Sequence, residues 1–170
     1  LFAPDATYGR PEDFKRLIAA AHERNIMVLL DVVYNHFGPD GNYLHTYAPE
    51  FFTKRHTTPW GAAINFETHS TVRQFFIENA LFWLEEYQLD GLRFAAVQTI
   101  FDTGTPDIMT ELMLAIRKGP GSRRHIHLIL ENDRNQAESL RRDDAGQPLQ
   151  ATAQWNDDFH HILHTMTSGE

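Results

Sequence analysis

Cysteine is absent from this sequence of 170 residues. The chain therefore has no disulfide framework and no thiolate metal site, and this absence is typical of proteins from a reducing compartment. We accordingly expect a cytoplasmic location.

Long hydrophobic runs are also missing. The longest extends from Ile26 to Leu30 and resumes at Val32, which is far too short to span a bilayer. The first residues lack the basic and then apolar layout of a signal peptide. We expect no membrane partner.

Basic clusters are equally scarce. The formal net charge is −8, and the Lys and Arg residues form no run. A partner rich in phosphate groups would favour a basic face, so nucleic acid is not expected as a partner.

The sequence does contain enough apolar material for a core. Hydrophobic residues make up 42% of the chain and aromatic residues 12%, which argues against disorder. The length fits one ordinary domain.

Helical periodicity appears in three segments. In the first, Pro11 occupies a first turn, and Phe14, Leu17, Ile18 and Ala21 follow at the spacing of one apolar face. The other two segments show comparable patterns. The predicted helices extend over about 11–25, 72–87 and 106–117.

Three short apolar segments predict strands at 26–33, 89–94 and 125–131. The first, IMVLLDVV, is rich in β-branched residues without alternation, as expected for a strand buried on both faces of a parallel sheet. Because predicted strands and helices alternate, we expect right-handed βαβ units. A polar insertion at about 37–69 separates the first strand from the second helix.

The spacing of the strands predicts an α/β fold of the TIM-barrel type. An eightfold (β/α)8 barrel takes about 250 residues, so one unit matches the interval from position 95 to position 131. The interval from position 31 to position 95 is one unit plus an insertion of about thirty residues. Residues 1–170 then hold only part of such a barrel, with parallel strands and outer helices.

Polar residues lie at the carboxyl end of each predicted strand, where such barrels build their active sites. They are Asp31, Asn35 and His36 after the first strand, Arg93 on the second, and Glu131 after the third. An alternative is that these are ordinary turn residues, because Asn and Asp favour strand ends.

The second strand raises a question. Arg93 and Ala95 lie two residues apart in GLRFAAVQ and therefore point to the same face of a strand. The arginine would then point toward a side chain that carries no charge, where its surroundings favour an acid.

Three motifs carry a family resemblance. The segments DVVYNH, GLRFAAVQ and LILEND resemble, in order and spacing, the first three signature motifs of the α-amylase family of retaining glycoside hydrolases. In that family the third, fourth and fifth barrel strands carry them, which implies that this chain holds roughly the third to sixth βα units. Three further segments, HFGPDGNYL, PWGAAINF and AQWNDDFHH, are similar to the trehalohydrolase branch.

The resemblance implies a function in trehalose biosynthesis. Trehalohydrolases release trehalose from the end of an α-glucan chain by a retaining mechanism. The implied partner is an α-1,4-glucan or maltooligosyltrehalose, and no cofactor is implied.

The resemblance also implies roles for individual residues. Glu131 matches the general acid/base, and Arg93 matches the arginine that holds the nucleophilic aspartate ionised. Asn35 and His36 match residues of the first sugar subsite, and Asp31 matches an acid that supports its strand end. For Trp155 two interpretations stay open: stacking on a sugar ring, or a tryptophan of the core or rim.

Two positions depart from the family pattern. Ala95 stands where the family has the nucleophilic aspartate, and Gln98 stands where it usually has histidine. The motif with the third family carboxylate is expected beyond position 170. Engineered substitution, natural loss and sequence error each explain the departures.

Three hypotheses about function follow. The chain is an inactive or incomplete glycoside hydrolase, a non-catalytic α-glucan-binding remnant, or a barrel fragment with no independent function. An incomplete barrel leaves sheet edges unpaired, so we also expect self-association through those edges. We expect no metal site, because His160 and His164 have no carboxylate at a zincin spacing.

Overall fold

A four-stranded parallel sheet forms the centre of the computed structural model, which describes residues 1–134 and 136–169. Its strand order is β1-β4-β5-β6. The strands are β1 (Leu29–Val32), β4 (Gly91–Phe94), β5 (His127–Asn132) and β6 (Ala153–Asn156). All three pairings between neighbouring strands are parallel.

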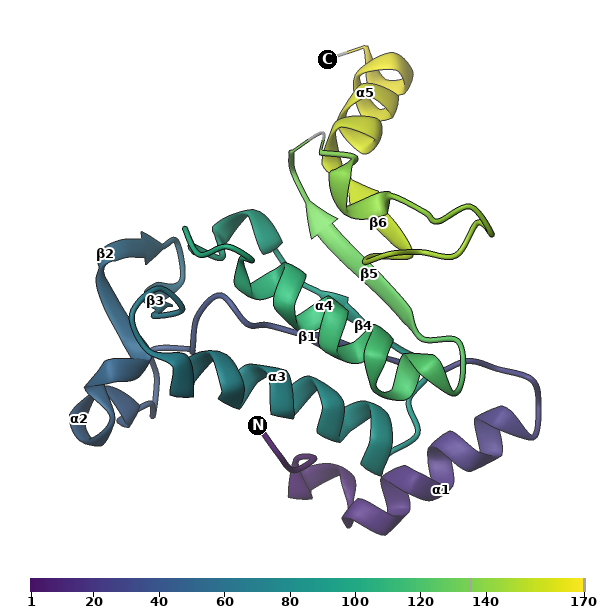
Figure 1. Cartoon of the computed structure of the whole chain (residues 1–170), viewed down its shortest axis with the longest axis horizontal. Helices are drawn as coiled ribbons and strands as arrows, with labels where there is room; N and C mark the ends of the chain where they lie inside the picture. Colours follow the sequence, from purple (N-terminus) through teal and green to yellow (C-terminus); the bar gives the residue numbers. More distant parts are fainter. Residues whose placement is uncertain (135, 170) are drawn as a thin grey trace.

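Helices alternate with the strands along the chain. Helix α1 (Pro11–His22) precedes β1, α3 (Ser70–Glu86) precedes β4, and α4 (Ile108–Lys118) precedes β5. Figure 1 shows α3 and α4 side by side over the sheet, while α5 (Asp157–Ser168) extends beyond the end of β6. None of the described helices combines the length and apolar character needed to cross a membrane.

The two faces of the sheet differ because side chains alternate along each strand. The core face carries apolar residues that are almost completely buried, namely Leu92, Phe94, Leu128 and Leu130. The opposite face, here called the open face, carries Asp31, Arg93 and Glu131. The helices therefore cover one face of the sheet and leave the polar face accessible.

The three predicted helices and the three predicted strands are confirmed, with shifted bounds. Helix α1 ends at His22 rather than near Asn25, because Asn25 adopts a left-handed φ of 57° and Ile26 N–H donates back to the Ala21 carbonyl. Strand β1 is shorter than the predicted 26–33, and both Ile26 and Met27 are exposed.

The insertion at 37–69 is more ordered than a polar loop. It contains the short helix α2 (Leu44–Tyr47) and an antiparallel hairpin of β2 (Phe52–Thr58) and β3 (Gly61–Ile64). A bridge between His36 and Ala63 joins the hairpin to the segment after β1. The insertion therefore lies beside the carboxyl end of β1.

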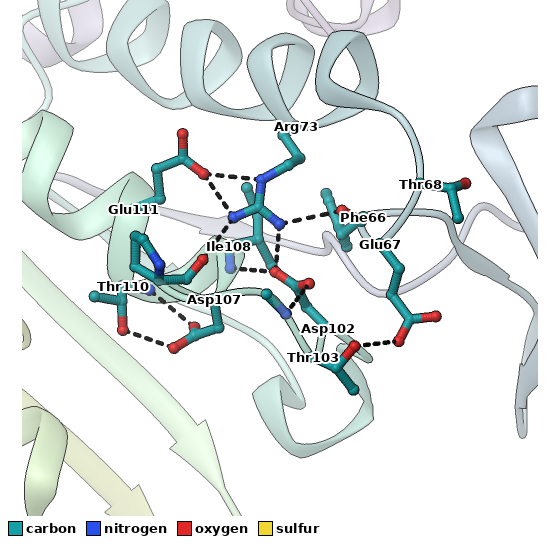
Figure 2. Close-up of polar contacts among 12 residues, drawn as sticks. Phe66, Glu67, Thr68, Arg73, Asp102, Thr103, Asp107, Ile108, Thr110 and Glu111 are labelled. Carbon is teal, nitrogen blue, oxygen red and sulfur yellow. Dashed lines mark hydrogen bonds and ion pairs between the residues drawn. The ribbon is translucent and has the colours of Figure 1, made fainter.

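One partly buried arginine ties the insertion to the segment after β4. Figure 2 shows the Arg73 side chain of α3 among carboxylates and carbonyl groups. It bonds Glu111 through Nε and Nη2 at 2.8 and 2.6 Å, and it pairs with Asp102. It also donates to the carbonyls of Phe66 at 3.1 Å and Pro106 at 3.0 Å. All five N–H donors of this arginine therefore have acceptors.

We predict that Arg73→Met destabilises the fold strongly. The Asp102 side chain is only 2% exposed, so the substitution leaves a buried carboxylate without its cation. Breaking a buried pair in this way costs about 3–5 kcal/mol in the free energy of unfolding, measured by denaturant titration. The control Arg123→Met removes the exposed pair with Glu85 and costs less than about 1 kcal/mol. Equal losses in the two variants would contradict the anchoring role of Arg73.

Candidate functional site

Three charged side chains meet on the open face of the sheet. In the strand register Asp31 of β1 lies opposite Arg93 of β4, and Arg93 lies opposite Ile129 of β5. Glu131 follows Ile129 by two residues and points to the same face. Parallel register thus brings residues far apart in the sequence to one place.

Arg93 bridges the two carboxylates. Its Nη1 donates to both oxygens of Asp31 at 2.8 Å, and its Nη2 lies 3.2 Å from Glu131 Oε2. The arginine therefore does not point only at the uncharged Ala95, as the sequence suggested. Its Nε remains buried without a hydrogen-bond partner among the described residues.

The turn after β4 also contacts Glu131. Ala95 N–H still donates to the Val32 carbonyl of β1, so the parallel ladder continues to this position. Ala96 then adopts a left-handed conformation, with φ 46° and ψ 51°, and its N–H donates 3.0 Å to Glu131 Oε2. One carboxylate oxygen of Glu131 thus faces a backbone amide and the Arg93 guanidinium.

Asn35 and His36 lie beside this turn. Asn35 is 2% exposed, and its amide nitrogen donates to Thr99 Oγ1 at 2.5 Å. Thr99 in turn donates to the Ala96 carbonyl at 2.7 Å. Asn35 Oδ1 lies 2.8 Å from His36 Nδ1, so the amide fixes the imidazole. The end of β1 and the turn after β4 therefore form one hydrogen-bonded unit.

Two tryptophans border the same region. Trp155 lies opposite Glu131 in the register of β5 and β6 and is 56% exposed. The Arg93 guanidinium lies 4.2 Å from the centre of its ring and makes a cation–π contact with it. Trp60, at the hairpin turn, stacks on His36 with 5.3 Å between ring centres and an interplanar angle of 27°.

Sequence reasoning missed Trp60 as a site residue. The segment PWGAAINF supported only the family resemblance, and the contact with His36 depends on the fold of the insertion. The tight turn Pro59–Gly61 between two short strands was the available signal.

Gln98, the other departure from the family pattern, lies in the segment that follows β4. Gln98 belongs to the 3-10 helix Val97–Thr99, and its Oε1 is buried without a hydrogen-bond partner among the described residues. For a metal, the described residues provide no cluster of three or more His, Cys, Asp or Glu side chains.

The site as a whole suits a polyhydroxylated ligand. It offers an ionisable carboxyl group, an arginine and an imidazole as hydrogen-bonding groups, with two partly exposed indole rings beside them. Aromatic rings and hydrogen-bonding side chains together are suited to the apolar and hydroxyl surfaces of a sugar. Ala95, in contrast, provides no nucleophile.

Comparisons with known proteins found related sequences. Residues 3–60 match the family model described as the α-amylase catalytic domain. The malto-oligosyltrehalose trehalohydrolase of Deinococcus radiodurans is 41% identical over 170 residues, which cover 99% of this chain and 26% of that protein.

Solved structures are similar to this chain in fold. A Salmonella typhimurium protein assigned as an α-amylase superimposes with a TM-score of 0.93 and 46% identity, covering 99% of this chain and 28% of that one. A pullulanase from Paenibacillus barengoltzii, an aspartate-to-alanine mutant complexed with maltotriose, has a TM-score of 0.56 and 29% identity, covering 70% of this chain and 18% of that one. The predicted partial (β/α)8 barrel is confirmed.

The matched region is a minor part of each relative. The chain spans about a quarter of the length of the trehalohydrolase from D. radiodurans, and a similar share of the Salmonella protein.

We predict that His36 stays neutral at pH 7. Partial burial lowers the pKa of His36 below the ordinary histidine value of about 6.5. Since the unfolded chain binds this proton more readily, protonation below about pH 6.5 disfavours the folded state, and stability falls as the pH decreases. An NMR titration of the ring protons measures the midpoint. A midpoint above 6.5 would contradict this assignment.

Proposed function

We propose that this chain, which belongs to the α-amylase family of glycoside hydrolases, is a trehalohydrolase-like barrel segment that retains sugar recognition and lacks its nucleophile. Residues 1–170 then belong to one catalytic barrel, with an insertion at 37–69. The observation that carries the proposal is the bridge from Arg93 to Asp31 and Glu131 beside Ala95.

Each site residue has a proposed role. Glu131 is the general acid/base that protonates the leaving oxygen. The ion pair between Arg93 and Asp31 stabilises the carboxyl ends of their two strands. Asn35 and His36 donate and accept hydrogen bonds with the sugar hydroxyls. Trp155 stacks on a sugar ring, and we add Trp60 to this role because it lies on His36.

The retaining reaction explains why Ala95 matters. In the first step a carboxylate attacks the anomeric carbon while the glycosidic bond breaks, and the leaving oxygen takes a proton from the acid. In the second step water attacks the anomeric carbon, releases the nucleophile and returns a proton to the same residue. Alanine has no lone pair for the first step, so the proposed chain binds substrate without this displacement.

A non-catalytic glucan-binding function is the second candidate. It is favoured by the order of Asn35, His36, Arg93 and Glu131 around Ala95, each of which makes a hydrogen bond or an ion pair. The related pullulanase, an aspartate-to-alanine mutant complexed with maltotriose, offers an analogy for this candidate. A purely structural fragment would instead bind no sugar. We place either form in the cytoplasm because cysteine is absent.

We predict that the chain binds maltotetraose with a dissociation constant in the millimolar range, about −4 kcal/mol. Calorimetry measures this affinity on folded protein. Trp155→Ala weakens binding several-fold because stacking area is lost, whereas Tyr8→Ala, a matched change at an exposed aromatic on another part of the chain, has no effect. Absence of heat at concentrations well above this range would exclude the binding function and favour the structural fragment.

We predict that Ala95→Asp restores hydrolysis in a polypeptide completed with the remaining barrel units. The new carboxylate supplies the nucleophile and its charge, so turnover of maltotriosyltrehalose rises by several orders of magnitude. Without the reversion, azide replaces the nucleophile and gives a sugar azide of inverted anomeric configuration.

The matched control is Ala96→Asp, which places the same acid one residue away, on the turn. It restores no activity. If neither Ala95→Asp nor azide produces turnover, position 95 does not correspond to the nucleophile of the family. The alignment of GLRFAAVQ with the family motif is then incorrect.

We also propose self-association through the sheet edges. Strands β1 and β6 are the edge strands of the described sheet, and unpaired edges favour pairing between chains. Sedimentation velocity should show dimers or larger species that increase with concentration. A single monomeric species across the concentration range would contradict this.

A further inference from the structure

An aspartate is followed by glycine at two places in the chain, and the fold gives the two steps opposite surroundings. Asp40 and Gly41 occupy an exposed turn between the segment after β1 and helix α2. Asp90 and Gly91 lie at the start of β4, in the middle of the sheet. Such a step is chemically labile, because glycine has no side chain to keep its amide nitrogen away from the aspartate carboxyl group.

The turn at Asp40 is unrestrained. Neither Asp40 nor Gly41 makes a hydrogen bond or an ion pair within the described part of the chain. Gly41 has a φ of 69°, and the position that a Cβ would take there meets no atom within 4 Å beyond its chain neighbours. The Gly41 nitrogen and the Asp40 carboxyl group can therefore approach each other without the loss of any packing contact.

The step at Asp90 is held from several sides. Asp90 Oδ2 accepts the Val28 N–H at 2.7 Å and lies 2.8 Å from His22 Nε2. The Asp90 N–H donates to the Val28 carbonyl, and its carbonyl accepts the His127 N–H, both at 2.9 Å. A Cβ at Gly91 would lie 2.1 Å from the His127 carbonyl oxygen, so the strands leave no space for an additional backbone atom.

The exposed turn is anchored on both of its sides. Before it, the Phe37 ring packs against the rings of Phe52 and Phe76, with 5.9 and 6.2 Å between ring centres. After it, Asn42 Oδ1 accepts the Leu44 N–H at 3.0 Å at the start of α2. Exposed residues between these anchors can absorb a longer backbone at position 40, and the fold is retained.

We propose that Asp40 is a site of spontaneous isoaspartate formation. The Gly41 nitrogen attacks Cγ of the protonated Asp40 carboxyl group, an N–C bond forms, and the carboxyl hydroxyl leaves as water with the amide proton. Water then opens the cyclic imide. Attack at Cγ returns aspartate, whereas attack at the main-chain carbonyl gives a chain that continues through Cβ and Cγ. One water is lost and one is regained, so the mass is unchanged and no oxidant is needed.

The test is an ageing experiment on the folded chain at neutral pH. Peptide mapping by chromatography and mass spectrometry separates the isoaspartyl peptide from its parent of equal mass. Isoaspartate should accumulate at position 40 at least about tenfold faster than at position 90, because conversion at Asp90 first requires local opening of the sheet. Comparable rates at the two positions in the folded chain would overturn the proposal.

The unfolded chain provides the internal control. In denaturant the hydrogen bonds of Asp90 are lost, so isoaspartate should form at both positions at similar rates. If Asp90 remains as slow in denaturant as in the folded chain, neighbouring sequence and not the fold protects it, and the structural argument fails.

Variants assign the modification to one residue. Asp40→Glu keeps the charge but places the carboxyl group one methylene too far for ready ring closure. Isoaspartyl methyltransferase with labelled S-adenosylmethionine should methylate the aged parent chain and give most of this signal no longer in aged Asp40→Glu. The control Asp144→Glu, at another exposed position, should leave the signal unchanged. Equal labelling of aged Asp40→Glu and the parent would overturn the assignment, and none of these outcomes depends on glucan binding.

Discussion

The guanidinium of Arg93 holds the open face of the sheet together. It contacts Asp31 on β1, Glu131 on β5 and the ring of Trp155 on β6, and so connects all four strands through side chains. The Arg93 side chain is only 16% exposed, whereas Asp31 is 61% exposed, so solvent screens the pair with Asp31 more than the pair with the less exposed Glu131.

The segment after β4 is fixed at both ends, and this explains why the site stays ordered around an alanine. At its start Thr99 binds Asn35 and the Ala96 carbonyl, while Ala96 donates to Glu131. At its far end the buried Asp102 pairs with Arg73. Between them Phe101 stacks on His56 of the hairpin, with ring centres 4.4 Å apart. None of these contacts requires a carboxylate at position 95.

The regular elements of the barrel could be predicted from sequence because their patterns are local. Apolar strands such as 125–131 and amphipathic helices such as 106–117 depend on burial on one side or both. Strand β6 was missed since Ala153–Asn156 is short, polar and partly exposed, and its strand character comes only from pairing with β5. The final helix α5 was missed with it, although Asn156 caps its first turn.

Several residues of the candidate site could be proposed from the sequence, whereas Trp60 and the contacts within the site could not. The strand ends placed Asp31, Arg93 and Glu131 together, since parallel register brings such ends to one edge. The two partners of Arg93 and the stack of Trp60 on His36 depend on strand order and on the folded insertion, which local patterns do not encode.

A crystal structure of the Ala95→Asp variant bears most directly on the role of Arg93. If the strand has room for a carboxylate at position 95, the new aspartate will accept a hydrogen bond from Arg93 Nε, which has no hydrogen-bond partner among the described residues. Arg93 will keep its contacts with Asp31 and Glu131. An aspartate that turns away from the guanidinium, or an Arg93 that leaves Glu131, would contradict the view that Ala95 marks the place of a lost acid.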